Sequence, residues 1–442
     1  MSASKHFRKI FTKTNLRELY YSSVRYRSAV GIDSVNRRSF EHRIEENIDV
    51  IYRKARTGEY NFSPYREKLI LRGRDKLPRV VSIPTIRDKL TLKSLYENLR
   101  QIYDDDIPFV HQIIHQISDS LSENIYDGVI KLDIKNFYPS INHNILLNQL
   151  KKRIRKKEIL SLVFSAINQP TVTKDNKEEH KINELGVPQG LSISNMLANI
   201  YFQSIDKKHN DSISFKYFRY VDDILILCDC NETNDIKKQI YLDCKELGLE
   251  VHHNNPEKTK TCMVTDEFTY LGYLFQGSKL SVRKRSVNHL RESIIKIFTN
   301  YKYSKTSDTA LLKWAIDLRI TGCIFNGTKY GWLFFFSQIN DCELLGSLDH
   351  FVKKQANRFG IVPTAISFKK FLRAFNEITN NLTNTKYIPN FDNFSIPEKR
   401  RLLRDVFNLK TQILTEDDIQ FQFNRRIYQK VKELEKDLAR VS

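Results

Sequence analysis

The chain has little of what marks a secreted or membrane-bound protein. Its six cysteines are few for 442 residues and include no C-x-x-C pair, which argues against both a disulfide framework and a zinc site. Residues 1–13 carry basic side chains and no apolar core, so they fit neither a secretion signal nor a spanning helix. Apolar runs elsewhere are too short to cross a bilayer. We therefore expect reduced thiols, no membrane partner and a cytoplasmic location.

The sequence also lacks repeats of fixed period and low-complexity tracts, which excludes a solenoid or a disordered scaffold. Hydrophobic residues make up 40% of the chain, enough to bury a core. At 442 residues the chain is too long for one core of ordinary size, so two or three subdomains are expected.

Positive charge is what the chain has in excess. Lys and Arg number 72 against 52 Asp and Glu, a net charge of +20 that is spread along the sequence. Such a balance favours a polyanionic partner, although a merely soluble basic protein remains an alternative. Charge alone does not identify the chemistry.

The first part of the chain alternates helix and hairpin signals. Apolar residues at helical spacing predict a helix over 40–57 that ends at Gly58. Two strand-like runs, 68–72 and 79–83, flank a turn at 73–76 and predict a basic hairpin. A second helix is expected over 86–103.

From residue 127 the pattern becomes strand, helix and strand pair. We expect a strand over 129–134, a helix over 141–154 and a hairpin over 215–228, with a surface loop at 173–181. Beyond Gly277 the chain turns helical and basic, and a solvated face explains those charges as well as an RNA-binding face does. A composition shift near 378–397 indicates a linker. The predicted fold class is α+β.

Carboxylates occupy two of these predicted elements. Asp133 ends an apolar strand, and Asp222 and Asp223 stand between apolar strand-prone runs, at the tip of the predicted hairpin. The similar stretch 103–106, Tyr-Asp-Asp-Asp, closes a helix and is interpreted as an acidic helix end or a turn. A buried aspartate is costly unless it is paired or bound to metal, so a partner such as Lys131 is the structural alternative for Asp133. Oxygen ligands of this kind suit Mg²⁺ at a nucleotide's phosphates.

The segments in this order resemble the reverse transcriptase family over roughly residues 30–275. The motifs that carry the resemblance are 131–138 (KLDIKNFY), 186–192 (GVPQGLS) with Ser194, Asn195 and Asn199, 220–223 (YVDD), 247–250 (LGLE) with 257–260 (EKTK), and 270–273 (YLGY). Segments at 31–34, 40–41 and 58–60 resemble the amino-terminal extension of bacterial enzymes related to group II introns.

The resemblance implies a right-hand polymerase. It places an amino-terminal extension and fingers at 1–127, the palm at 128–150 and 181–279 around a fingers insertion at 151–180, a helical thumb at 280–377 and a helical extension at 378–442.

The resemblance also implies a role for each matching residue. Two Mg²⁺ ions, with Mn²⁺ as an alternative, are expected on Asp133, Asp222, Asp223 and the carbonyl of Ile134. Lys258 is the expected general acid for the leaving pyrophosphate, with Lys260 as the alternative. The residues expected to bind the deoxynucleoside triphosphate are Tyr138 as steric gate against a ribose 2′-hydroxyl, Gln189 at the base and sugar, and Arg79 and Arg87 at the triphosphate.

The implied function is an RNA-directed DNA polymerase that copies a structured non-coding RNA into a cDNA product. Residues 319–322, 330–336 and 348–349 resemble the thumb of domesticated prokaryotic groups associated with phage defence, and no ribonuclease H, integrase or His-Asn-His endonuclease segment follows residue 280. An antiviral role is therefore expected. The alternatives are a template-independent DNA polymerase of the abortive-infection type and a non-catalytic, RNA-binding maturase. The oligomeric state is not indicated by the sequence.

Overall fold

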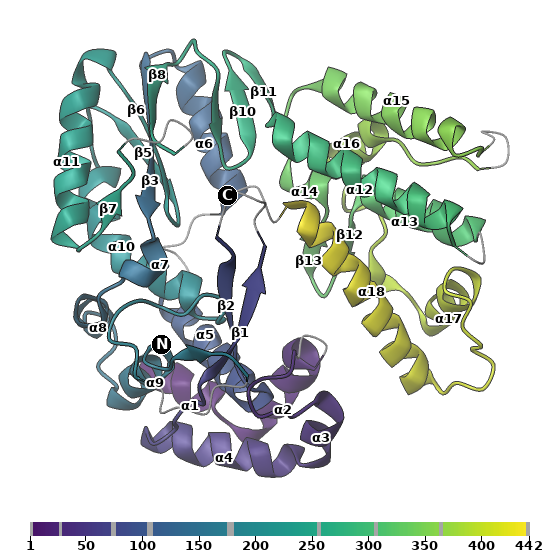
Figure 1. The fold of residues 1–442 in the computed structure, drawn as a ribbon, viewed down its shortest axis with the longest axis horizontal. Coiled ribbons are helices and arrows are strands. Elements are labelled where there is room, and N and C mark those ends of the chain that lie inside the picture. Colours follow the sequence, from purple (N-terminus) through teal and green to yellow (C-terminus); the bar gives the residue numbers. More distant parts are fainter. Residues whose placement is uncertain are drawn as a thin grey trace. The chain divides into compact units, whose positions relative to one another are not determined.

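The computed structural model describes residues 3–25, 29–71, 77–103, 109–174, 181–253, 258–304, 308–361 and 366–438 (Figure 1). The chain forms two compact units. Unit 1 comprises residues 1–109 and 128–261, and unit 2 comprises residues 110–127 and 262–442. Each unit is therefore built from two separate stretches of sequence.

Unit 1 mixes helices with strands. Its helices are α1 Ala3–Ile10, α2 Lys13–Leu19, α3 Arg37–His42, α4 Ile44–Thr57, α5 Ile86–Tyr103, α7 Phe137–Ser140, α8 His143–Lys151, α9 Lys157–Ile167, α10 Ser194–Asn210 and α11 Thr233–Glu246, with a π-helical segment at Tyr20–Val24 and a 3₁₀ turn at Cys230–Glu232. Its strands are β1 Tyr65–Ile70, β2 Arg79–Ile83, β3 Gly128–Lys135, β4 Thr171–Val172, β5 Lys216–Tyr220, β6 Asp223–Cys228 and β7 Glu250–Val251. Strand β8, Lys260–Met263, contains the point at which the sequence passes into unit 2.

Two sheets organise unit 1. The smaller sheet has the order β2-β1-β4, in which β1 and β2 are antiparallel. The larger sheet contains the path β5-β6-β3-β7, with antiparallel neighbours throughout. Strands β3 and β6 are buried along almost their whole length, because their runs Val-Ile-Lys-Leu and Ile-Leu-Ile-Leu are nearly continuous in apolar residues. The hydrophobic core of unit 1 joins this sheet to the amino-terminal helices.

Local sequence signals explain several boundaries in unit 1. Helix α4 ends where Gly58 adopts a left-handed conformation with φ of 79°, which glycine tolerates without steric cost. The single helix predicted over 40–57 is divided, because Arg43 leaves helical geometry with φ of −121° and ψ of 34° between α3 and α4. Helix α5 has the predicted bounds, and buried apolar residues recur along it.

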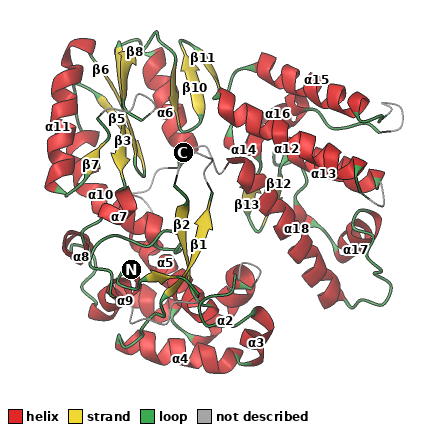
Figure 2. Cartoon of the chain, viewed as in Figure 1, coloured by secondary structure: helices red, strands yellow, loops and turns green. Residues whose placement is uncertain are grey.

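Unit 2 is mainly helical (Figure 2). Its helices are α6 Val110–Ser122, α12 Lys284–Lys302, α13 Thr309–Thr321, α14 Trp332–Phe335, α15 Cys342–Arg358, α16 Phe371–Asn380, α17 Ile396–Asp405 and α18 Glu416–Leu438, with a 3₁₀ turn at Phe391–Asn393. Its further strands are β9 Phe268–Tyr270, β10 Tyr273–Gln276, β11 Lys279–Val282, β12 Cys323–Phe325 and β13 Thr328–Tyr330. These strands form the antiparallel sheet β11-β10-β9 and the hairpin β12-β13.

The carboxyl-terminal part of the chain is packed into unit 2. Phe391 lies within the stretch 378–397 where the composition shifts, and it is 2% exposed in a core shared with Phe423 and Ile427 of α18. Helix α12 follows β11 directly and buries Val287, Leu290 and Ile294. Basic helices beyond residue 280 are thus held by ordinary apolar packing.

The predicted hairpins at 68–83 and 215–228 are confirmed by the antiparallel registers of β1 with β2 and of β5 with β6. The predicted turn at 73–76 and the acidic run at 104–106 lie outside the described residues, as does most of the loop expected at 173–181. Within the described ranges, no helix has both the length and the apolar character that a bilayer crossing requires.

Candidate active site

Asp133 and the pair Asp222-Asp223 meet in the larger sheet of unit 1. Antiparallel pairing of β3 with β6 places Asp133 directly opposite Asp223. The backbone N–H of Ile134 also donates to the carbonyl of Asp222 over 3.1 Å. The predicted hairpin tip is the two-residue turn Val221-Asp222, since Tyr220 pairs with Asp223. Carboxylates from two distant parts of the sequence therefore share one end of the sheet.

Burial and electrostatic repulsion between these carboxylates raise the pKa values of two of them. Burial and then the charge of Asp222 raise the pKa of Asp223 to about 7. Burial and then the charge of Asp133 raise the pKa of Asp222. Desolvation and like charges both disfavour an ionised carboxylate, so the cluster is short of positive charge.

Lys258 supplies part of that charge. Its Nζ lies 2.5 Å from Oδ2 of Asp133, which is itself 5% exposed. Of the two lysines named for the general acid, Lys258 makes this contact, whereas Lys260 is an exposed residue of β8. Glu257 of the same sequence block lies outside the described residues.

A histidine that sequence reasoning missed also faces Asp133. Nε2 of His252 is 3.4 Å from Oδ1 of Asp133, and the backbone N–H of His252 donates to the Asp133 carbonyl over 3.0 Å. The short strand β7 brings it there by pairing Val251 with Ile134. The sequence contains little indication of this position. Its one signal is a polar residue after a short apolar stretch.

Tyr138 follows Asp133 closely in both sequence and space. Asn136 adopts a left-handed conformation with φ of 50°, which asparagine tolerates, and the chain then enters α7. The Tyr138 hydroxyl donates to Oδ1 of Asn195 over 2.6 Å. Burial, followed by the charge of Asp222, raises the pKa of Tyr138, which links the ring electrostatically to the carboxylate cluster.

The loop 186–190 is held against two other elements by its glycines. At Gly190, with φ of 103°, an added Cβ would meet Cγ1 of Val81 at 2.6 Å, and at Gly186, with φ of 87°, it would meet the carbonyl oxygen of Pro139 at 2.8 Å. Because only glycine permits both the conformation and the approach, the loop reaches β2 on one side and α7 on the other.

This loop brings Gln189 to Arg79. The Arg79 Nε donates to Oε1 of Gln189 over 2.6 Å, and the backbone N–H of Ser82 donates to the Gln189 carbonyl over 2.7 Å. Arg79 also counteracts the rise in the pKa of Asp222. Arg87 lies in the first turn of α5, and its Nε is buried without a hydrogen-bond partner among the described residues. Among the described residues, no hydrogen bond or ion pair joins Arg87 to the three aspartates.

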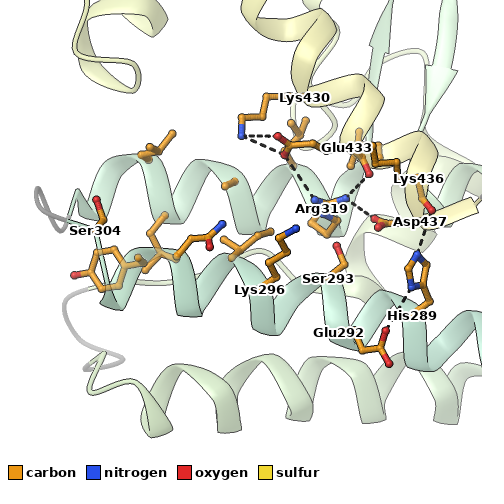
Figure 3. A pocket seen from close by; sticks show the side chains of 18 of the residues that line it. His289, Glu292, Ser293, Lys296, Ser304, Arg319, Lys430, Glu433, Lys436 and Asp437 are labelled. Atoms are coloured by element: carbon orange, nitrogen blue, oxygen red, sulfur yellow. Dashed lines mark hydrogen bonds and ion pairs between the residues drawn. The ribbon is translucent and has the colours of Figure 1, made fainter. Parts of the chain in front are cut away.

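A cavity of about 540 Å³ lies in unit 2, lined by residues of α12, α13 and α18 (Figure 3). Its charged side chains are largely paired with one another: Arg319 donates to Asp437 over 2.5 Å, and Lys430 lies 3.2 Å from Glu433. None of the predicted site residues is among the described residues that line it. We assign this cavity no part in the chemistry.

Carboxylates gathered at one end of an antiparallel sheet, within an α+β fold, are the arrangement expected of a nucleotidyltransferase of the right-hand polymerase class. Residues 72–275 match the family described as reverse transcriptase (RNA-dependent DNA polymerase). These residues thus correspond to a reverse transcriptase domain, and the α+β class predicted from the sequence is confirmed.

Several proteins are similar to the chain at low sequence identity. Protein YkfC of Escherichia coli is 23% identical over 58% of this chain and 76% of its own length. The Retron Se72 reverse transcriptase of Salmonella heidelberg is 23% identical over 82% of this chain and 83% of its own. The Group II intron-encoded protein LtrA of Lactococcus lactis is 28% identical over 37% of this chain but only 28% of its own length. The chain is thus related to the group II intron and retron lineage of reverse transcriptases.

Proposed function

We propose that this protein synthesises DNA on an RNA template by nucleotidyl transfer supported by two divalent cations. The observation that carries the proposal is the convergence of Asp133, Asp222 and Asp223 at one end of the β3-β6 pair. The match of residues 72–275 to the reverse transcriptase family supports the choice of RNA as template and deoxynucleotides as substrates.

The donor set fits Mg²⁺. The three carboxylates offer hard oxygen ligands, and the raised pKa values of Asp222 and Asp223 indicate an uncompensated negative charge that a cation would relieve. Asp133 and Asp222 would hold the ions, with Asp223 and the Ile134 carbonyl in support. When bound, such ions activate the attacking primer hydroxyl and stabilise the leaving pyrophosphate.

The remaining side chains would select and orient the nucleotide. Tyr138, fixed by Asn195, would exclude a ribose 2′-hydroxyl, so deoxynucleotides would be preferred. Gln189 would position the base and sugar, and its bond to Arg79 would keep the guanidinium ready for the triphosphate. Arg87, with its unpartnered buried Nε, would bind phosphate as well.

Lys258 is the proposed proton donor. Its ammonium lies 2.5 Å from the Asp133 carboxylate, beside the proposed metal ligands. From there it would protonate the pyrophosphate that leaves. Lys260 is the alternative proton donor.

We propose further that the template is a structured non-coding RNA that stays bound to the protein and that the DNA product serves antiviral defence in the cytoplasm. Support comes from the net charge of +20 and from the resemblance of residues 319–322, 330–336 and 348–349 to the thumb of defence-associated groups. A net positive charge of this size suits a long phosphate-rich ligand.

The test is to purify the protein from cells and to sequence both the RNA and the DNA that accompany it. The proposal expects one enriched RNA species and DNA complementary to it. Random cellular RNA would contradict a dedicated template. Homopolymeric or random DNA would instead identify a template-independent polymerase, and RNA without any DNA would identify a maturase-like binding protein.

A further inference from the structure

Val221, the first residue of the catalytic turn, is held in an unfavourable conformation. Its φ is 56°, in the left-handed region that β-branched residues rarely adopt. A two-residue hairpin turn with positive φ at its first position normally takes glycine there. Something else in unit 1 must therefore stabilise the turn that presents Asp222.

Arg219 makes the contact that can do so. Its Nη1 donates to the carbonyl oxygen of Val221 over 2.8 Å, although Arg219 itself is only 9% exposed. Hydrogen bonds from a charged donor are stronger than neutral ones, and in a buried position they are not screened by water. The bond fixes the orientation of the peptide unit that joins Val221 to Asp222.

The guanidinium is in turn immobilised by helix α10. Nε and Nη2 of Arg219 bind the two carboxylate oxygens of Asp206 at 2.7 and 2.5 Å, and Nη1 also donates to Asn199 over 3.1 Å. The Phe202 ring lies under the guanidinium, with 4.7 Å from its centroid to Cζ. Asn199, Phe202 and Asp206 are spaced three and four residues apart, so they form one face of the helix.

We propose that Arg219 is a positioning residue that, anchored on α10, keeps the Val221 turn in its strained conformation and thereby presets the Asp222 carboxylate for metal binding. This inference rests on the proposed function of Asp222 as a metal ligand. The same helix carries Asn195, the partner of Tyr138, so α10 would align the metal ligands and the nucleotide gate together.

The conservative variant Arg219→Lys keeps the charge but cannot bind Asp206 bidentately and also reach Val221. We expect kcat for primer extension to fall roughly 10- to 100-fold, the size of effect that follows from losing a hydrogen bond to a charged group. The divalent-cation concentration for half-maximal rate should rise, while KM for the deoxynucleotide stays within a few-fold.

A second substitution separates positioning from general stability. Glycine adopts positive φ without strain, so Val221→Gly in the Arg219→Lys background should recover a substantial part of kcat and of the cation affinity.

Asp243→Asn is the matched control, because Asp243 is a buried carboxylate that also pairs with α10, through His209 at 2.6 Å. It should lower the melting temperature without moving the cation requirement.

Mn²⁺ binding measured by electron paramagnetic resonance provides a readout that does not need DNA synthesis. If the wild-type protein binds Mn²⁺ but makes no DNA, the proposed function fails while the positioning role is still tested by the loss in Arg219→Lys and the recovery in the double variant. Wild-type cation binding and kcat in folded Arg219→Lys would overturn the inference. So would a loss that Val221→Gly does not relieve.

Discussion

At the scale of single residues, the site brings like charges close together, which is electrostatically unfavourable for the folded protein. Asp133, Asp222 and Asp223 repel one another, and Lys258 compensates them only in part. Repulsion of this kind is unfavourable for the folded protein, and a divalent cation bound at the proposed site would relieve it.

The first prediction concerns stability without metal. The pKa of Asp223 is raised in the folded state from 3.8 to about 7, so the folded protein holds its proton more tightly than the unfolded chain does. The corresponding stabilisation is complete below about pH 4 and is lost as the pH rises through 7. In EDTA at pH 8, Asp223→Asn should therefore be more stable than wild type by roughly 1–3 kcal/mol. The expected gain is smaller than the full pKa shift would give, because Asp223 is partly exposed and solvent screens its charge.

Urea unfolding at pH 8 and pH 5 measures this difference, which should shrink at the lower pH. Asp211→Asn, at an exposed position, is the control and should leave stability unchanged at both pH values. A stabilisation by Asp223→Asn that is equal at pH 5 and pH 8 would contradict the charge account.

The second prediction concerns the sugar of the nucleotide. Tyr138→Ala removes the ring and should raise ribonucleotide incorporation relative to deoxynucleotide incorporation by roughly 10- to 100-fold. Tyr138→Phe keeps the ring but loses the 2.6 Å bond to Asn195, so it should give a smaller loss of discrimination. Single-nucleotide extension with each sugar gives the ratio of kcat/KM values. Unchanged discrimination in Tyr138→Ala would rule out the gate.

At the scale of elements, the loop 186–190 depends on glycine where it touches β2. Gly190→Ala should destabilise the protein by roughly 1–3 kcal/mol and lower activity, because the new Cβ would lie 2.6 Å from Val81 and displace Gln189. Gly248→Ala is a fitting control, since Gly248 also has positive φ, at 69°, but meets nothing within 4 Å. Equal effects of the two changes on primer extension would show that the contact with β2 does not matter.

The sequence predicted the elements that carry their own local signal. The strands around Asp133 and Asp222 are apolar runs that end at a polar residue, and α5 has a regular apolar pattern, so their positions were foreseeable. The break between α3 and α4 was not foreseeable, because arginine is not a helix-breaking residue and nothing in its local sequence marks Arg43 as a boundary.

Contacts between side chains distant in sequence were also beyond prediction. Asn195 reaches Tyr138 across 57 positions, and the sequence motif gave each residue without indicating that they bond. Arg219 stands immediately before the catalytic motif, yet its link to Asp206 exists only because α10 packs beside β5. Such pairs depend on tertiary structure, which local patterns do not encode.

At the scale of the whole molecule, the excess of positive charge is the property most relevant to a nucleic-acid partner. With 72 basic against 52 acidic residues, binding to RNA should be dominated by phosphate contacts. For six to ten such contacts, affinity should fall by roughly 10³-fold or more between 50 and 200 mM salt. Fluorescence anisotropy measures this, and a peptide nucleic acid of the same sequence serves as the uncharged control. A flat salt response would contradict a large RNA interface.

Asp222 is proposed to hold the catalytic metal together with Asp133. Primer extension by Asp222→Asn, compared with wild type at equal RNA binding, tests it most directly. Loss of the ligand charge should reduce DNA synthesis by at least roughly 10³-fold, on the order of 4 kcal/mol of transition-state stabilisation, while RNA affinity is retained. Synthesis at an unchanged rate by the folded variant would contradict the account.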